Sequence, residues 1–251
     1  ETKIMTDVPV AVSFTEKMIS AVIGQSDVTQ SFMYGVLLQL MTFHSYEDLK
    51  IVIMTNGENE KKWEFLKSSP YCWDDDKTIR LFSSNLDDAN EISMFLDSII
   101  QNRKYEDGDT TKLNTADYKN YKPYFLIITD DYQTLRNIEI IKDVLAQKIN
   151  VGFSMLIVQE RLLGLPSECT QFLNINPDES AIYENELVDD KQQTFAADFI
   201  GNIDVRKLNK MIANIPIEMA KDRYALPNKL GFLEMFNVGK IEQLNILSAN
   251  I

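Results

Sequence analysis

Residues 21–32 read AVIGQSDVTQSF, and this stretch decides the fold. Its apolar start is typical of a buried strand, and after the polar connector the chain stays mostly apolar as far as Phe43, as in a buried helix. The connector begins directly after Gly24, where the backbone can turn sharply. The stretch therefore predicts a strand–loop–helix unit, with the strand over 18–24 and the helix over about 28–43.

The connector follows the phosphate-binding pattern G-x-x-x-x-G-K-[ST] in outline but lacks two of its residues. Gly24 and Ser31 match, whereas Thr29 stands where the second glycine belongs and Gln30 replaces the lysine. In a working loop the lysine ammonium contacts the β- and γ-phosphates, and the second glycine keeps the backbone amides accessible. A neutral amide and a β-branched side chain provide neither. These four residues are therefore predicted to be degenerate Walker-A-like positions.

A second part of such a site follows the apolar run at 124–129. Asp130 and Asp131 come directly after this run, in the position of the Walker-B carboxylates. In an active ATPase the first acid holds magnesium through water, and the second, usually Glu, polarises the attacking water. Asp131 is one methylene shorter than Glu, so no catalytic role is assigned to either residue. We expect no cofactor in this domain, with ATP and Mg²⁺ as the alternative.

Both stretches also have simpler interpretations. Asp27 and Gln30 have the spacing of a capping box, so the connector can serve as a helix start; we take both interpretations as true. The two aspartates can also end an exposed strand and bind nothing. No metal site is predicted, because the consecutive carboxylates at 74–76 cannot easily converge on one ion and the two cysteines, Cys72 and Cys169, lack metal-ligand spacing.

Short apolar runs alternate with helical patterns along the chain. We predict further strands over 8–14, 49–54, 78–82, 124–129, 151–158, 172–175 and 180–183, and further helices over 61–66, 87–103, 137–147, 204–215, 231–236 and 240–247. Residues 104–122 are polar and aperiodic, which predicts a long loop. The alternation indicates an α/β, P-loop NTPase-like fold of three layers with a mostly parallel central sheet. We expect a single domain over 1–251, in which residues 165–251 form short strands and helices.

The net charge of −13 limits the classes of partner. Excess carboxylate repels phosphate backbones, and no cluster of lysine or arginine offsets it, so we expect no nucleic acid ligand. No apolar run approaches the roughly 18 residues that a membrane span requires. The polar start at Glu1 also lacks the hydrophobic region of a signal peptide. We therefore expect the chain itself to be soluble, without a span or leader of its own.

Further stretches carry a family resemblance. Residues 63–67 (WEFLK), 70–74 (PYCWD) and 78–80 (TIR), with the tail LP at 226–227 and GFLEMFNVGKIEQL at 231–244, resemble the coupling ATPases of type VII secretion, in the FtsK/SpoIIIE group. The resemblance spans nearly the whole chain, and its tail motif is fairly specific. One departure is Tyr71, where the family usually has His.

In this family a membrane-anchored protein carries several ATPase-like domains in series on the cytoplasmic side, and a hexamer is expected for the full protein. The resemblance implies that this chain is the membrane-proximal domain, which precedes the first domain with an intact Walker A motif. Its partners would be the membrane segment and downstream domains of the same protein, and other secretion-system components. The resemblance also implies a RecA/FtsK-like fold whose nucleotide positions are Gly24, Thr29, Gln30, Ser31, Asp130 and Asp131.

Three functions follow from these observations. The preferred hypothesis is a non-hydrolysing pseudo-ATPase that connects the membrane segment to the motor domains and transmits motion between them. The first alternative is a weak ATPase in which a lysine from elsewhere in the chain, or from a neighbouring subunit, replaces the one missing at Gln30. The second is a docking module for a substrate or partner, whose surface is the loop at 104–122.

Overall fold

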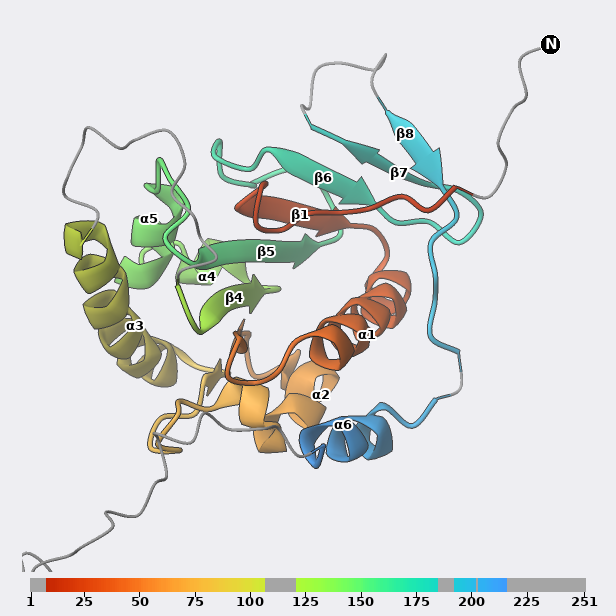
Figure 1. The fold of residues 1–251 in the computed structure, drawn as a ribbon. Helices are drawn as coiled ribbons and strands as arrows, with labels where there is room; N and C mark the ends of the chain where they lie inside the picture. Colours follow the sequence, from red (N-terminus) through yellow and green to blue (C-terminus); the bar gives the residue numbers. More distant parts are fainter. Residues whose placement is uncertain (1–7, 107–120, 185–191, 202, 216–251) are drawn as a thin grey trace, which may run out of the picture. The chain divides into compact units, whose positions relative to one another are not determined.

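Apolar runs rich in Ile, Val and Phe form the centre of the molecule, an eight-stranded sheet (Figure 1). The structure is a computed structural model, and it describes residues 8–106, 121–184, 192–201 and 203–215. In the sheet the strands lie in the order β3-β2-β4-β5-β1-β6-β7-β8. Their bounds are β1 Ile19–Ile23, β2 Leu49–Met54, β3 Phe82–Ser83, β4 Tyr124–Thr129, β5 Phe153–Gln159, β6 Gln171–Asn174, β7 Ser180–Tyr183 and β8 Gln193–Phe195. Neighbouring strands from β3 to β6 are parallel, whereas β6–β7 and β7–β8 are antiparallel.

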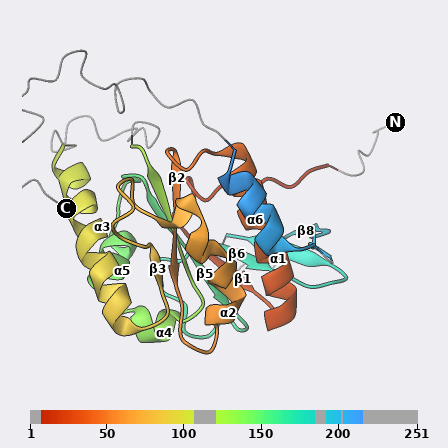
Figure 2. The same cartoon turned by 90° about the horizontal axis from the view of Figure 1, so that it is seen from below.

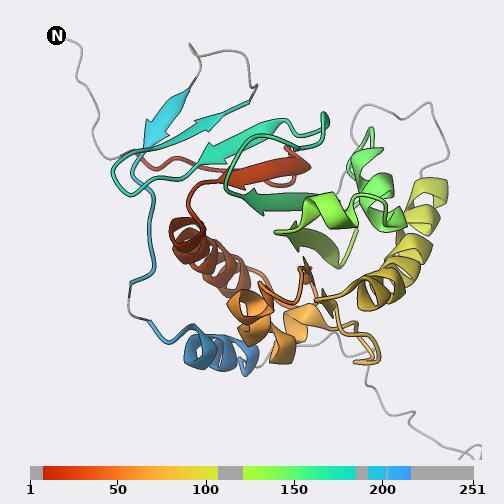
Figure 3. The same cartoon turned by 180° about the vertical axis from the view of Figure 1, so that it is seen from behind.

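Helices cover both faces of this sheet, as Figures 2 and 3 show from two further sides. The α-helices are α1 Ser26–Phe43, α2 Glu60–Trp63, α3 Leu86–Glu106, α4 Tyr132–Leu135, α5 Glu139–Leu145 and α6 Val205–Ala213, and two 3₁₀ helices are η1 Glu64–Ser68 and η2 Pro70–Cys72. Buried side chains of α3, α4 and α5 form one apolar cluster with the sheet. Those of α1, α2, η1 and η2 form the other, against which α6 also packs. The predicted three-layer α/β fold with a mostly parallel sheet is therefore confirmed.

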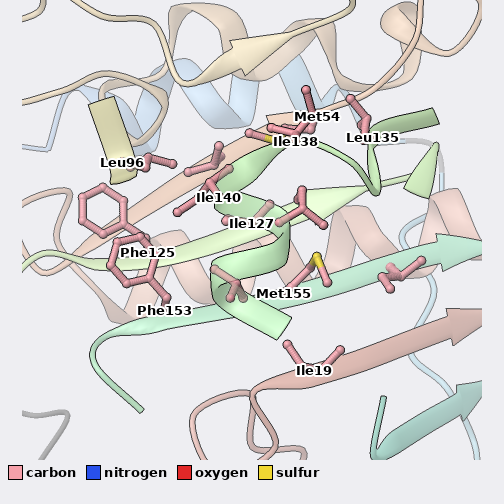
Figure 4. Packing of buried hydrophobic residues seen from close by; sticks show 14 of the residues in the cluster. Ile19, Met54, Leu96, Phe125, Ile127, Leu135, Ile138, Ile140, Phe153 and Met155 are labelled. Atoms are coloured by element: carbon pink, nitrogen blue, oxygen red, sulfur yellow. The ribbon is translucent and has the colours of Figure 1, made fainter. Parts of the chain in front are cut away.

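The apolar strands are continuous because the sheet is buried on both faces. In β4, Phe125 and Ile127 face the cluster around α3 and α5, while the alternate residues Leu126 and Ile128 face α1. Figure 4 shows the first cluster, in which the rings of Phe125 and Phe153 stack with centroids 4.9 Å apart. Because successive side chains of a strand point to opposite faces of the sheet, successive residues of β4 pack into different cores.

Arg103, near the end of α3, ties that helix to the amino ends of β4 and β5. Its Nη1 donates to the carbonyls of Val151 at 3.1 Å and Gly152 at 3.4 Å, and its Nη2 donates to the carbonyl of Pro123 at 2.8 Å. The side chain is only 8% exposed. The guanidinium carbon also lies 5.3 to 5.4 Å from three ring centroids, those of Tyr121, Phe125 and Phe153. A buried cation stacked on aromatic rings in this way joins α3 to the sheet.

Several predicted elements differ from the observed ones. The strand predicted over 8–14 is wrong: those residues form no strand, and Pro9 has no N–H to donate to a ladder. The outer edge is instead β8, which was not predicted. Of the strand predicted over 78–82, only Phe82 lies in β3, and Arg80 makes an isolated bridge to Trp73. The helix predicted over 137–147 is observed as the shorter α5, and the short helix α4 before it was not predicted.

Other predictions fall partly or wholly outside the described residues. The helices predicted over 231–236 and 240–247 lie there, as does most of the loop predicted over 104–122, whose first residues belong to α3. The single domain over 1–251 therefore stays a prediction. Within the described ranges, no helix combines the length and the apolar character needed to cross a membrane.

A polar cluster lies where α3 packs against α5. The hydroxyl of Ser93 donates to Asp97 Oδ2 at 3.1 Å and accepts the backbone N–H of Ile140 at 2.9 Å. The other carboxylate oxygen, Oδ1, is buried and has no hydrogen-bond partner among the described residues. Burial raises the pKa of Asp97, and the charges of Asp143 and Glu139 add to the rise against the opposing effects of Ser93 and Lys104. The ionised carboxylate therefore destabilises the folded state.

Replacing Asp97 with asparagine is expected to raise the stability of the domain at pH 8. The gain should be no more than about 1 kcal/mol, because the amide removes the charge but keeps a polar atom at the buried Oδ1 position, and the site is only part-buried. Because the folded carboxyl binds its proton more tightly than the unfolded one, the gap between wild type and variant should close as pH falls through the raised pKa. Thermal unfolding at several pH values measures this gap. Glu91→Gln, exposed on the same helix, is the control and should show no such trend.

Candidate functional site

The connection from β1 to α1 is shorter than the sequence predicts. The strand ends at Ile23 and the helix begins at Ser26, so only Gly24 and Gln25 connect them. Thr29 is consequently inside the helix, where its backbone N–H donates to the carbonyl of Gln25 at 2.9 Å. Its hydroxyl contacts the carbonyls of Gln25 and Ser26, both at 3.1 Å. Ser26 and Asp27, which the sequence places in the loop, thus belong to the first turn of α1.

The predicted capping pair is wrong, although the connector does start a helix. The N-cap residue is Gln25, and within the described ranges no side chain makes a capping hydrogen bond to the start of α1. Gln30 instead donates its amide to the carbonyl of Lys62 at 3.2 Å. Ser31 donates its hydroxyl to the carbonyl of Ile200 at 2.8 Å. Both side chains are therefore committed to neighbouring segments of the chain.

Gly24 allows a close approach between two strands. Its φ of +154° lies in a region that L side chains rarely adopt, and a Cβ built on it would lie 2.4 Å from the carbonyl oxygen of Ile175. The Gly24 N–H donates to the carbonyl of Gln159 at 3.2 Å. The close packing at the carboxyl ends of β1, β5 and β6 thus explains why this position requires a glycine.

Asp130 follows β4 at the same edge of the sheet, and protein donors occupy both of its oxygens. Thr55 Oγ1 donates to Oδ1 at 2.5 Å, and the indole Nε1 of Trp63 donates to Oδ2 at 2.8 Å. Burial raises the pKa of Asp130, while these two hydrogen bonds and the charge of Lys62 oppose the rise. The carboxyl group is held in place by β2 and α2.

The hydrogen-bond partners of Asp131 differ from those of Asp130. It accepts hydrogen bonds from Asn56 Nδ2 at 3.2 Å and Thr134 Oγ1 at 2.8 Å, and its own N–H donates to Thr129 Oγ1 at 3.1 Å. These contacts fix the turn between β4 and α4.

A cavity of about 260 Å³ lies between α1, α2 and the ends of β4 and β5. It brings together Thr29, Gln30 and Asp130, whereas Gly24, Ser31 and Asp131 are not part of its lining. The other lining residues are Ser26, Asn59, Lys62, Trp63, Val158, Gln159 and Glu160. Lys62 is the one cation among them, and its Nζ donates to Ser26 Oγ at 2.8 Å. Across the described ranges, no group of three or more His, Cys, Asp and Glu side chains could hold a metal ion.

Sequence reasoning missed the donors that hold Asp130. Thr55 and Asn56 follow the apolar run of β2, and the carboxyl ends of neighbouring parallel strands meet at one edge, so their position was predictable in principle. Lys62 and Trp63 reach the site from a short helix, and no local pattern indicates that contact.

Comparison with known proteins gives the context of this fold. No protein-family model matches the chain. The type VII secretion system protein EssC of Staphylococcus aureus (strain NCTC 8325 / PS 47) is 25% identical over 231 residues, which are 91% of this chain and 15% of EssC. The ESX secretion system protein YukB of Bacillus subtilis (strain 168) is 23% identical over 247 residues, 97% of this chain and 16% of YukB. The chain thus spans less than a fifth of these relatives.

Solved structures with the same fold include an EssC and an EccC protein. ATPases 2 and 3 of EssC from Geobacillus thermodenitrificans superpose with a TM-score of 0.54 at 14% identity, covering 88% of this chain and 49% of that one. The cytoplasmic domain of the type VII secretion ATPase EccC from Thermomonospora curvata gives a TM-score of 0.51 at 14% identity, covering 80% and 28%. The chain is therefore homologous over most of its length to EssC and YukB of type VII secretion, and it has the fold of the EssC and EccC ATPase domains.

Proposed function

We propose that this chain is a non-hydrolysing pseudo-ATPase domain of a larger type VII secretion protein. In that protein it links a membrane segment to downstream ATPase domains, on the cytoplasmic side of the membrane and within a hexamer. Its homology to a small part of the much longer EssC and YukB supports a place within a multidomain chain. It has no role in nucleic acid binding, in keeping with its net charge of −13.

The early start of α1 is the observation that supports the loss of ATPase activity. A phosphate-binding loop wraps successive backbone N–H groups around the anion. Here α1 begins at Ser26, and from Thr29 onward the N–H groups donate to carbonyls one turn earlier. A nucleotide would have to unwind this turn before those amides could reach its phosphates.

The acidic side of the site supports the same proposal. Both oxygens of Asp130 already accept protein hydrogen bonds, and Ser31, where the pattern places the magnesium-binding hydroxyl, donates to Ile200 instead. With Glu160 also lining the cavity, an ATP molecule would bring its phosphates close to two carboxyl groups.

Neither the wild-type chain nor a Thr29→Gly/Gln30→Lys double variant is expected to bind ATP tighter than about 100 μM, a binding free energy of about −5.5 kcal/mol. The double variant restores the glycine and the lysine of the pattern but leaves the short β1–α1 connection unchanged. Calorimetry with ATP and Mg²⁺, together with a phosphate-release assay, tests this, with an intact ATPase domain of a relative as positive control. Magnesium-dependent binding below that limit, or turnover that Asp130→Asn abolishes, would contradict the proposal.

One observation favours a second candidate, a weak ATPase. Lys62 brings an ammonium group into the cavity beside Ser26 and Asp130, where it could stand in for the lysine missing at Gln30. In that case Lys62→Ala should abolish phosphate release. The neighbouring Lys61, which is exposed, provides the matched control, because Lys61→Ala should leave any such activity unchanged.

A further inference from the structure

A second cavity, of about 200 Å³, lies at the opposite edge of the sheet from Asp130. It is bounded by the end of α1, the amino ends of β2 and β4, β5, and the segment before β1. Its apolar and aromatic walls come from Phe14, Leu40, Leu49, Tyr121, Tyr124 and Leu126. Asp130 follows the carboxyl end of β4, whereas this cavity lies at its beginning, so the two sites share no lining residue.

The size of the cavity matches a single ring. A designed apolar cavity of about 150 Å³ in another protein stays free of water and binds benzene. Here the exposed wall is also mostly apolar, but the cavity is open to solvent on one side. A molecule of six to ten heavy atoms would displace water from these walls and make dispersion contacts with them.

One polar side chain beside the cavity has no hydrogen-bond partner in the part of the chain that the structure describes. Ser154, on β5, is 1% exposed, and its Oγ is buried without such a partner. It lies opposite Leu126 in the register of β4 and β5, and both residues line the cavity. Nearly all buried hydroxyl groups are hydrogen-bonded, so an unpartnered one beside a cavity indicates a missing partner.

The charged groups around the cavity are already paired. Lys122 Nζ donates to Asp48 Oδ1 at 2.6 Å, and the hydroxyl of Ser45 donates to Asp48 Oδ2 at 2.8 Å. The Tyr124 hydroxyl accepts a hydrogen bond from Asn150 at 2.9 Å. A ligand that carries a charge would have to compete with these pairs, whereas an uncharged ligand leaves them intact.

We infer that this cavity binds a small uncharged molecule of single-ring size that carries one hydroxyl or carbonyl group. The ring fills the space between Leu40 and Leu126. Its polar group exchanges a hydrogen bond with Ser154 Oγ once a rotation about χ1 of Ser154 turns the oxygen, which is otherwise closed off, toward the cavity. The inference does not depend on the proposed function, because it uses none of the residues around Asp130.

Phenol and benzene are matched probes for this site. Phenol is expected to bind the 251-residue chain about three- to tenfold more tightly than benzene, the ratio that one net hydrogen bond supplies. Ser154→Ala, which removes only the hydroxyl, should leave benzene affinity unchanged and bring the ratio close to one. Leu40→Phe, which extends into the cavity, should weaken both probes. NMR titrations of leucine methyl signals measure the affinities and locate the site, and the dispersion of the same spectra verifies that each variant is folded.

Three outcomes would overturn the inference. The first is that neither probe shifts the methyl signals of Leu40 or Leu126 at millimolar concentration. The second is a phenol preference that survives in folded Ser154→Ala. The third is a crystal structure in which an ordered water bonds to Ser154 and is not displaced by phenol.

Discussion

Replacing Arg103 with alanine is expected to lower the free energy of unfolding by about 3–5 kcal/mol, from the lost hydrogen bonds to a charged donor and the cavity left behind, and this is a large share of a domain's stability. The change leaves three backbone carbonyls, those of Pro123, Val151 and Gly152, without the donor that they share. It also removes the cation from the aromatic rings around it and opens space between α3 and the sheet. Urea unfolding followed by circular dichroism measures the loss.

Two further variants separate the causes. Arg103→Lys keeps the charge but loses the planar fork, so it should recover only part of the stability. Arg136→Ala is the control, because Arg136 is exposed and its contact is a 3.4 Å hydrogen bond to Gln133. A loss in Arg103→Ala no larger than that in Arg136→Ala would show that the cluster is not an anchor.

Gly24→Ala is expected to cost about 2–4 kcal/mol, from the backbone strain and the overpacking that a Cβ introduces there. The Cβ would lie 2.4 Å from a backbone oxygen, that of Ile175, which cannot move without disturbing the strand pairing next to it. Thermal and urea unfolding should both show the loss. A Cβ at Gly57 would have no atom within 4 Å, so Gly57→Ala should change stability by less than about 0.5 kcal/mol.

The same pair of variants distinguishes two roles for Gly24. If the residue is kept for packing, the cost appears in stability. If it is kept so that the backbone can approach a phosphate, Gly24→Ala should instead preserve stability and weaken nucleotide binding. A stable Gly24→Ala variant would therefore contradict the packing role and weaken the case for a pseudo-ATPase.

The sheet was predictable where the strands are buried on both faces. The strands predicted over 49–54 and 124–129 coincide with β2 and β4. A short, nearly continuous apolar run of this kind is typical of a strand that is buried on both faces. The edges were not predictable in this way. The strand β8 is polar and, among the strands that the structure describes, pairs only with β7, while the apolar segment at 8–14 lies outside the sheet. At an edge, burial no longer distinguishes a strand from an extended segment.

The candidate site was predictable only in part, for a related reason. The positions of Thr29, Gln30 and Asp130 followed from strand and loop patterns, and the structure brings these three together. What each side chain bonds to depends on segments remote in sequence. Ser31 donates to a carbonyl 169 residues away, and no motif encodes that choice. The pattern therefore locates the site, and long-range contacts decide its chemistry.

The hydrogen bonds from α2 have a mechanical consequence. Trp63 holds the carboxyl group at the end of β4, and the neighbouring Lys62 bonds through its side chain to Ser26 and through its carbonyl to Gln30. Pulling α2 away from the sheet would leave a buried carboxyl oxygen unpaired, which is costly. The end of β4, the start of α1 and α2 are therefore expected to move as one unit. A displacement of any one of them would then be passed directly to β4, in the middle of the sheet.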